Sequence, residues 1–264
     1  MENALLAEGV GPEMRSLGLF KHEYSGESRI MSMPGLPRKI RAIAYIDGYN
    51  LYYGLRDAGF RRFLWLDLPS LARSFLRESQ ELIVTKYFTT RISTPEEKRR
   101  RQSDYLEALQ IHCGTSLRFY WGHYQLEDVI CRSCDAVDQI PTEKKTDVNI
   151  AVEMMTDAFC DAFDTAILIS ADSDLVPAVQ AIRRLFPQRS VVAAFPPERH
   201  SAELAKYANA VFTVGRTKLA GSQLPEVIIK PNMVELRRPS KWKEATTGFG
   251  SALENALKKS QSPS

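Results

Sequence analysis

The sequence contains little cysteine and no long apolar run. Four cysteines among 264 residues are too few for a disulfide scaffold, which favours a reducing, cytoplasmic setting. No apolar stretch approaches the roughly 20 residues that span a bilayer, so we expect no membrane contact. The N-terminus also lacks a basic segment followed by a long apolar core, and we therefore expect no signal peptide.

Nucleophilic pairs and internal repeats are also missing from the sequence. No Ser-His or Cys-His pair stands out, so we expect a reaction that needs no nucleophile from the protein. The composition is that of a soluble globular protein, with 44% apolar and 25% charged residues. A chain of this length predicts one large domain or one domain with extensions.

The net charge of +3 is distributed unevenly. Residues 216–264 contain nine Lys/Arg and four Asp/Glu, a local charge of +5, so the remainder sums to −2. We assign this segment to a basic C-terminal tail, which would suit either a polyanionic partner or solubility. Residues 1–38 show no sustained period and are interrupted by glycine and proline, so we expect a loosely ordered extension there. Residues 39–215 form the predicted catalytic domain.

Apolar runs alternate with helical segments across the predicted domain. The runs expected to be strands lie at residues 41–47, 82–89, 117–124, 165–170, 190–195 and 210–214. This alternation predicts an α/β fold with a largely parallel sheet that is covered on both faces. We interpret residues 125–145 as a long polar loop. The following helix carries an apolar stripe of Val148, Ala151, Val152, Met155 and Phe159, with Thr146 as the expected N-cap.

Four aspartates are the main candidates for chemistry. Asp47 ends the first apolar run, Asp172 and Asp174 follow another, and Asp147 opens the helix just described. Ligands of open α/β sheets bind beyond the carboxyl ends of the strands, where these side chains would gather. Clustered carboxylates repel one another, and a bound divalent cation relieves that repulsion. Hard oxygen ligands select Mg²⁺ or Mn²⁺, which can activate water and stabilise the leaving oxygen of a phosphodiester.

Each aspartate also has a purely structural interpretation. Asp47 and Gly48 favour a turn, Asp172 can cap a helix, and Asp147 can complement a helix dipole. The coincidence of all of them favours a site. Glu153 is excluded from it, because it lies six residues after Asp147 and therefore about 240° around the helix.

Several polar residues flank the aspartates. We predict that Asn50, Lys145 and Ser173 contact the substrate, although polar residues in solvated turns and loops are common and explain each of them as well. Cys131 and Cys134 form a lone C-x-x-C, which is half of a structural Zn²⁺ site. His112, Cys113 and His123 are the nearest residues that could complete it. Two free thiols are the favoured interpretation of this pair.

Three segments together resemble the motifs of NYN domains, a PIN-like nuclease group that includes LabA-like proteins. They are residues 45–54 (YIDGYNLYYG), 144–151 (KKTDVNIA) and 170–177 (SADSDLVP). The resemblance covers about residues 41–214 and implies a three-layer α/β/α sandwich with a central, mainly parallel sheet. It also implies a Mg²⁺- or Mn²⁺-dependent ribonuclease whose acids are Asp47, Asp147, Asp172 and Asp174. Ala171 stands where the family commonly has glycine, so the turn here should not need a positive φ.

The resulting hypothesis is endonucleolytic hydrolysis of RNA. Single strands are the expected substrate, because Tyr49, Tyr52 and Tyr53 could stack on unpaired bases. Core packing of these tyrosines is the alternative. Two other functions stay open: a non-catalytic RNA-binding or regulatory protein, and another acid-rich phosphotransfer enzyme such as a phosphatase. The RNA target and the oligomeric state are not evident from the sequence.

Overall fold

The computed structural model describes residues 38–130 and 137–243, with only the backbone described for 123–130 and 137–144. The predicted N-terminal extension, apart from Arg38, and the Cys131/Cys134 pair lie outside these residues. So does the end of the predicted tail, residues 244–264. None of the described helices is both long and apolar enough to cross a membrane.

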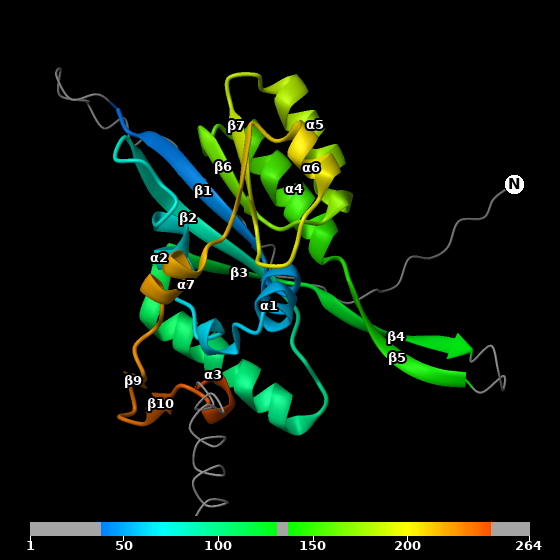
Figure 1. Ribbon diagram of the computed structural model, residues 1–264, viewed down its shortest axis with the longest axis vertical. Coiled ribbons are helices and arrows are strands. Elements are labelled where there is room, and N and C mark those ends of the chain that lie inside the picture. The colour runs from blue at the N-terminus through cyan, green and yellow to red at the C-terminus, as the bar shows by residue number, and fades with distance from the viewer. Residues whose placement is uncertain (1–37, 131–136, 244–264) are drawn as a thin grey trace, which may run out of the picture. The chain divides into compact units, whose positions relative to one another are not determined.

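A six-stranded parallel sheet forms the centre of the domain (Figure 1). From edge to edge its strands are β3 (Leu117–Trp121), β2 (Gln80–Thr89), β1 (Ile40–Asp47), β6 (Thr165–Ile169), β7 (Ser190–Phe195) and β8 (Ala210–Thr213). The chain first builds outward from β1 in one direction and then returns to build outward from β6 in the other. Between β1 and β6 the order therefore reverses, which makes this pair the topological switch point of the sheet.

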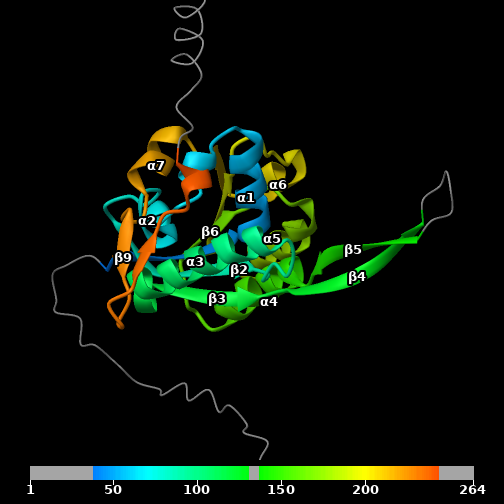
Figure 2. The same cartoon turned by 90° about the horizontal axis from the view of Figure 1, so that it is seen from below.

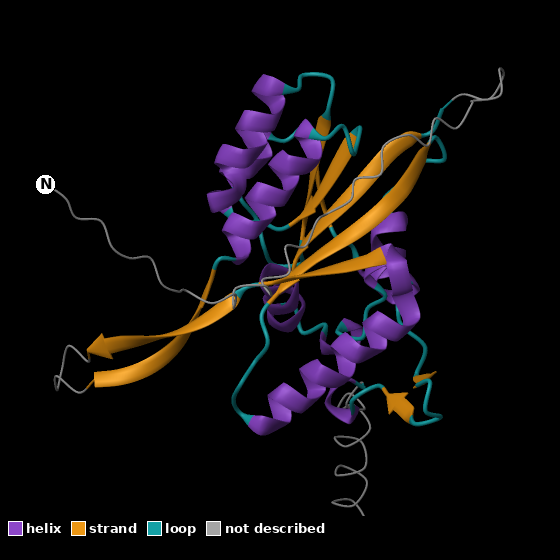
Figure 3. Cartoon of the chain, turned by 180° about the vertical axis from the view of Figure 1, so that it is seen from behind, coloured by secondary structure: helices purple, strands orange, loops and turns teal. Residues whose placement is uncertain are grey.

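Helices cover both faces of the sheet, which confirms the predicted three-layer α/β/α fold (Figure 3). One layer comprises α1 (Gly48–Asp57), α2 (Leu68–Arg73), α3 (Glu96–Cys113) and α7 (Arg216–Gly221). The other comprises α4 (Thr146–Phe159), α5 (Val176–Leu185) and α6 (Ala202–Tyr207). Short 3₁₀ helices occupy Arg61–Phe63 (η1), Gly114–Ser116 (η2), Ser173–Leu175 (η3) and Ser240–Trp242 (η4).

Strand β1 separates two hydrophobic cores. Because side chains alternate along a strand, Ala44 and Ile46 pack under the α1 layer while Ile43 and Tyr45 pack under the α4 layer. All of these residues are at most 2% exposed. Asp47 continues the odd-numbered series, so its side chain projects toward the α4 side, where Asp147 begins its helix.

Helix α4 buries a different face from the predicted one. Ile150, Met154 and Ala158 pack into the core, whereas Val148 and Phe159 of the predicted stripe are exposed. The helix is apolar on two sides, so periodicity alone could not choose between them. The prediction of Thr146 as N-cap was also wrong, because Lys145 holds that position and Thr146 is the first helical residue.

The described parts of residues 125–144 form a β-ribbon rather than the predicted loop. Strands β4 (His123–Ile130) and β5 (Val137–Lys144) pair antiparallel and extend away from the sheet (Figure 2). Val129, Ile130, Val137 and Ile140 favour extended backbone, which the polar neighbours obscured in the sequence. Pro141 is tolerated because neither strand of a two-stranded ribbon is central.

Part of the segment assigned to the basic tail is packed against the α1 layer. Its described residues form α7 and an antiparallel pair, β9 (Val227–Ile229) and β10 (Glu235–Arg237). Leu219, Leu236 and Trp242 are buried in the core of that layer. Two of its described cations pair with acids of the domain, Lys230 with Glu107 at 2.8 Å and Lys241 with Glu97 at 2.7 Å. The positively charged segment is therefore folded as far as residue 243.

Candidate metal centre

Three aspartates from separate segments meet at the switch point of the sheet. Asp47 is the last residue of β1, Asp172 follows β6, and Asp147 is in the first turn of α4. Each offers a carboxylate oxygen, and these oxygens all lie within 4.8 Å of one another. Asp47 is buried at 3% exposure, and the other two are half-buried. A compact set of carboxylate oxygens fits a hard divalent cation such as Mg²⁺ or Mn²⁺.

Asp47 is fixed through both of its carboxylate oxygens. Oδ1 accepts a hydrogen bond from the backbone N–H of Asn50 at 3.0 Å, which caps α1. Oδ2 accepts one from the Ser170 hydroxyl at 2.9 Å. The structural role that the sequence suggested for Asp47 was a turn. The structure shows a helix cap instead, and this cap coexists with a place in the carboxylate cluster.

Ser170 also organises the turn that carries Asp172. Its buried hydroxyl oxygen accepts a hydrogen bond from the backbone N–H of Asp172 at 3.1 Å. Asp172 Oδ1 in turn accepts one from the N–H of Asp174 at 2.9 Å. Ser170 thus connects two of the three clustered carboxylates. This role was not evident from the sequence, because a serine at the end of a strand is common and its burial could not be predicted.

Asn50 contacts the protein rather than facing open solvent. Its side-chain oxygen accepts a hydrogen bond from the backbone N–H of Ala171 at 3.1 Å, which joins the start of α1 to the turn after β6. Ala171 is not among the described residues with positive φ, as expected from its being alanine. Asn50 therefore positions the two segments that bring Asp47 and Asp172 together.

Gly48 allows α1 to approach β2 closely. A Cβ atom at this position would lie 2.7 Å from the carbonyl oxygen of Phe88 and 2.9 Å from the ring of Tyr87. Both contacts are closer than a real Cβ tolerates, and one of them is with backbone. The glycine next to Asp47 is thus required by packing, not by a positive φ.

Burial and mutual repulsion make the cluster electrostatically costly without a cation. Burial raises the pKa of Asp47 to about 7, against the opposing hydrogen bonds from Asn50 and Ser170. Burial, together with the charges of Asp172 and Asp174, raises the pKa of Asp147 to about 6. In the metal-free site, protons therefore remain bound up to about pH 6 to 7, and a cation would displace them.

The remaining predicted site residues lie around this cluster. Asp174 is exposed on η3, outside the group of three oxygens, although its charge acts on Asp147. Ser173 is exposed on the same turn. Lys145 is exposed immediately before α4 and has a left-handed φ of 75°, an uncommon value for a residue other than glycine.

Glu153 lies in a separate buried network beneath the α4 layer. Its carboxylate contacts Lys86 Nζ at 2.6 Å, and Asp157 contacts the same nitrogen at 2.7 Å. Tyr45 donates a hydrogen bond to Asp157 at 2.5 Å. The helical-angle prediction that Glu153 does not share a cation with Asp147 agrees with this arrangement.

Two of the residues proposed to complete a zinc site contact an aspartate. His112 Nε2 lies 3.4 Å from Asp67 Oδ2, and Cys113 Sγ lies 3.7 Å from Asp67 Oδ1. Burial raises the pKa of the Cys113 thiol to about 12, which disfavours the thiolate that binds metal. The zinc prediction itself concerns Cys131 and Cys134, which the structure does not describe.

The fold, the three motifs and the carboxylate cluster agree with a match to the NYN domain model over residues 41–215. The chain belongs to the NYN domain family, and hence to a PIN-like nuclease superfamily. This confirms the family that the three sequence motifs indicated.

Two individual proteins are similar to this chain. One is 6-hydroxy-3-succinoylpyridine 3-monooxygenase HspA of Pseudomonas putida (strain DSM 28022 / S16), 29% identical over 243 residues, covering 77% of this chain and 75% of that protein. The other is a crystal structure of a protein of unknown function, VPA0982, from Vibrio parahaemolyticus RIMD 2210633. It is 19% identical with a TM-score of 0.46 and covers 72% of this chain and 99% of that one.

Proposed function

We propose that this protein is a metal-dependent endoribonuclease that hydrolyses single-stranded RNA. The observation that supports it most is the convergence of Asp47, Asp147 and Asp172 within 4.8 Å at the switch point of the sheet. Membership of the NYN family supports the same reaction class and a nucleic-acid partner.

The clustered aspartates would hold Mg²⁺ or Mn²⁺, with Asp174 as a further acid at the rim. When bound, such a cation activates water near neutral pH and offsets the charge that develops on the phosphate. Ser170 and Asn50 keep Asp47 from rotating, so its carboxylate is preorganised. Lys145 and Ser173, both exposed beside the acids, are assigned to contacts with phosphate oxygens of the strand.

A cleavage assay with matched variants tests this proposal. Labelled single-stranded RNA is incubated with Mn²⁺ and wild-type protein, the Asp172→Asn variant, or the Glu203→Gln variant. Glu203 is an exposed acid in the first turn of α6 and serves as the control. Cleavage by the wild type and Glu203→Gln but not by Asp172→Asn supports the nuclease. RNA binding without metal-dependent cleavage would instead support the regulatory alternative.

A second candidate is oxygenation of a small aromatic heterocycle, the activity named for the Pseudomonas relative. A cavity lined by tyrosines beside α1 favours it, because such a surface suits a ring. Oxygen uptake with 6-hydroxy-3-succinoylpyridine, measured with a panel of nicotinamide and flavin reductants, tests this candidate. Substrate-dependent uptake would favour it over the nuclease.

A further inference from the structure

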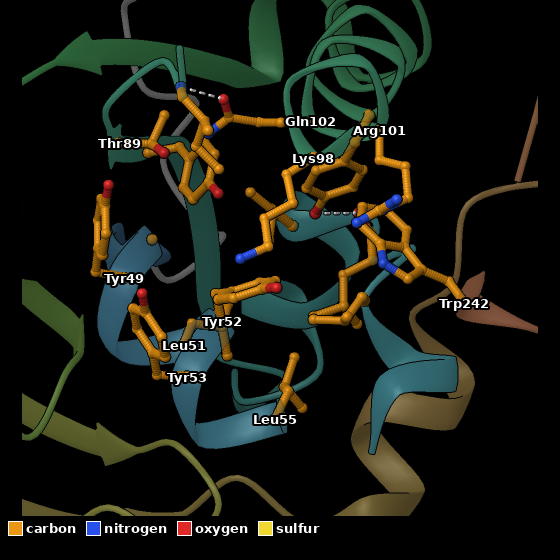
Figure 4. Close-up of a pocket in the computed structure, with 17 residues that line it drawn as sticks. Tyr49, Leu51, Tyr52, Tyr53, Leu55, Thr89, Lys98, Arg101, Gln102 and Trp242 are labelled. Carbon is orange, nitrogen blue, oxygen red and sulfur yellow. Dashed lines mark hydrogen bonds between the residues drawn. The ribbon is translucent and has the colours of Figure 1, made fainter. Parts of the chain in front are cut away.

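A cavity of about 120 Å³ lies between α1, α3 and the C-terminal segment (Figure 4). Its wall is mainly aromatic and aliphatic, and includes Tyr52, Leu55, Tyr105 and Trp242. Tyr105 and Trp242 meet edge to face, with ring centroids 5.7 Å apart. The proposed chemistry of the carboxylate cluster assigns no role to this cavity.

The size and lining of the cavity suit one flat ring. Its volume is of the same order as the roughly 150 Å³ apolar cavity in which benzene binds. Tyr52, which lines the cavity, is 39% exposed, so this part of the wall is accessible from solvent. Aromatic walls favour aromatic ligands, which gain from stacking and edge-to-face contacts.

The polar groups around the cavity add a preference for negative charge. The Lys98 side chain extends over it, and its nitrogen points toward Tyr52 (Figure 4). Within the described part of the chain, Lys98 has no acidic partner. Arg101 also lines the cavity, and its contact with Glu97 is long, at 3.6 Å.

Gln102 does not alter this preference for negative charge, because its side-chain amide is already hydrogen-bonded. Its amide nitrogen donates to the Thr90 carbonyl and its oxygen accepts from the Ile92 N–H, each at 2.8 Å. These bonds hold the segment after β2 against α3 and shape one side of the cavity. The available charge facing the interior is therefore cationic.

We propose that this cavity binds a planar aromatic ring that carries an anionic group, with the ring beside Tyr52 and the anion at Lys98. Gly48 and Tyr49 line the cavity and directly follow Asp47 in the sequence, so the cavity and the carboxylate cluster share the start of α1. Two sources share this chemistry: a nucleotide of an RNA strand and a small aromatic acid. The first would deepen the proposed nuclease, and the second would suit the alternative oxygenation.

Calorimetric titration of the full chain in EDTA distinguishes the contribution of the aromatic ring from that of the negative charge. It also identifies which of the two sources supplies the ligand. Adenosine 5′-monophosphate is compared with adenosine, and nicotinate with nicotinamide, so that each pair differs in its charge. We expect the charged member of at least one pair to bind about five to ten times more tightly. Lys98→Gln should remove that difference, and Tyr52→Ala should weaken both members of the pair.

Lys206→Gln is the matched control, because Lys206 lies 5.3 Å from the centroid of the Tyr207 ring on α6 and neither residue lines this cavity. Binding of the nucleotide alone or of the pyridine acid alone identifies the source, and either supports the proposal. Absence of binding by both acids, or binding that Lys98→Gln and Tyr52→Ala leave unchanged, overturns it. Because EDTA prevents metal-dependent cleavage, this result is independent of whether the protein cuts RNA.

Discussion

The Ser170 hydroxyl donates a 2.9 Å hydrogen bond to Asp47 and accepts one from the backbone of Asp172. The serine follows β6 and the aspartate ends β1, and these neighbouring strands flank the switch point of the sheet. A single buried side chain therefore fixes the distance between two carboxylates that belong to distant parts of the sequence.

Ser170→Ala should weaken cation binding without removing any acid. The hydrogen bond from Ser170 lowers the pKa of Asp47, so its loss should raise that pKa and disfavour the charged form. We expect Mn²⁺ affinity to fall about tenfold and stability by roughly 1–3 kcal/mol. Calorimetric titration and thermal melts measure both, with the exposed Ser103→Ala as control. Unchanged Mn²⁺ affinity would show that Ser170 does not position the carboxylates for cation binding.

Stability of the metal-free protein should fall as pH rises from about 4 to 7. The pKa of Asp47 is raised to about 7 in the folded state, above its value of about 3.9 in an unfolded chain. Between these values the folded state binds more protons, so rising pH favours unfolding by up to a few kcal/mol. Denaturant melts in EDTA across this range measure the effect.

Added Mn²⁺ should then stabilise the protein more at about pH 7.5 than at about pH 5, because the cation replaces the protons. Asp47→Asn removes the ionisable group, so its stability should depend less on pH and respond less to Mn²⁺. Equal Mn²⁺ effects at both pH values would contradict the proposed ligand role of the cluster.

Gly48→Ala should disturb the start of α1. Its Cβ would lie 2.7 Å from the Phe88 carbonyl oxygen, so either α1 or β2 must shift. We expect a loss of roughly 1–3 kcal/mol in stability and weaker RNA cleavage, because Asp47 caps this helix. Gly221→Ala is the control, since no heavy atom lies within 4 Å of its added Cβ. Equal melting temperatures for both variants would show that the contact between the added Cβ and the Phe88 carbonyl oxygen does not reduce stability.

Lys86→Met should be the more damaging of two lysine replacements. It leaves Glu153 and Asp157 without their shared buried cation, and we expect a loss of about 3–5 kcal/mol. Lys230→Met breaks a more exposed pair with Glu107 and should cost less than about 1 kcal/mol. Urea melts of both variants compare them. Adding Asp157→Asn to Lys86→Met should recover part of the lost stability.

The sequence was sufficient to predict the layers of the fold, because strands and helices alternate and most of the strands coincide with short apolar runs. It also predicted that Asp47, Asp147, Asp172 and Asp174 would gather beyond the carboxyl ends of the strands, and the first three of these do so, whereas Asp174 lies outside their group of oxygens. It did not identify the buried face of α4, because apolar residues occupy two sides of that helix. Requiring Asp147 to face the sheet would have selected Ile150 and Met154, which lie three and seven residues further on.

Other features depend on contacts that no local pattern reveals. Ser170 lies within a recognised motif, but its role follows from burial between two strands that are distant in sequence. The strands β4 and β5 are stabilised by pairing with each other, and neither is apolar enough to predict alone. The charge of the segment after Arg216 concealed buried residues such as Leu219 and Trp242.

Diffraction from crystals soaked in Mn²⁺, recorded at the manganese absorption edge, tests the central claim most directly. The proposed function predicts an anomalous peak bonded to carboxylate oxygens of Asp47, Asp147 and Asp172. Manganese found only elsewhere, at concentrations that support RNA cleavage, would contradict it.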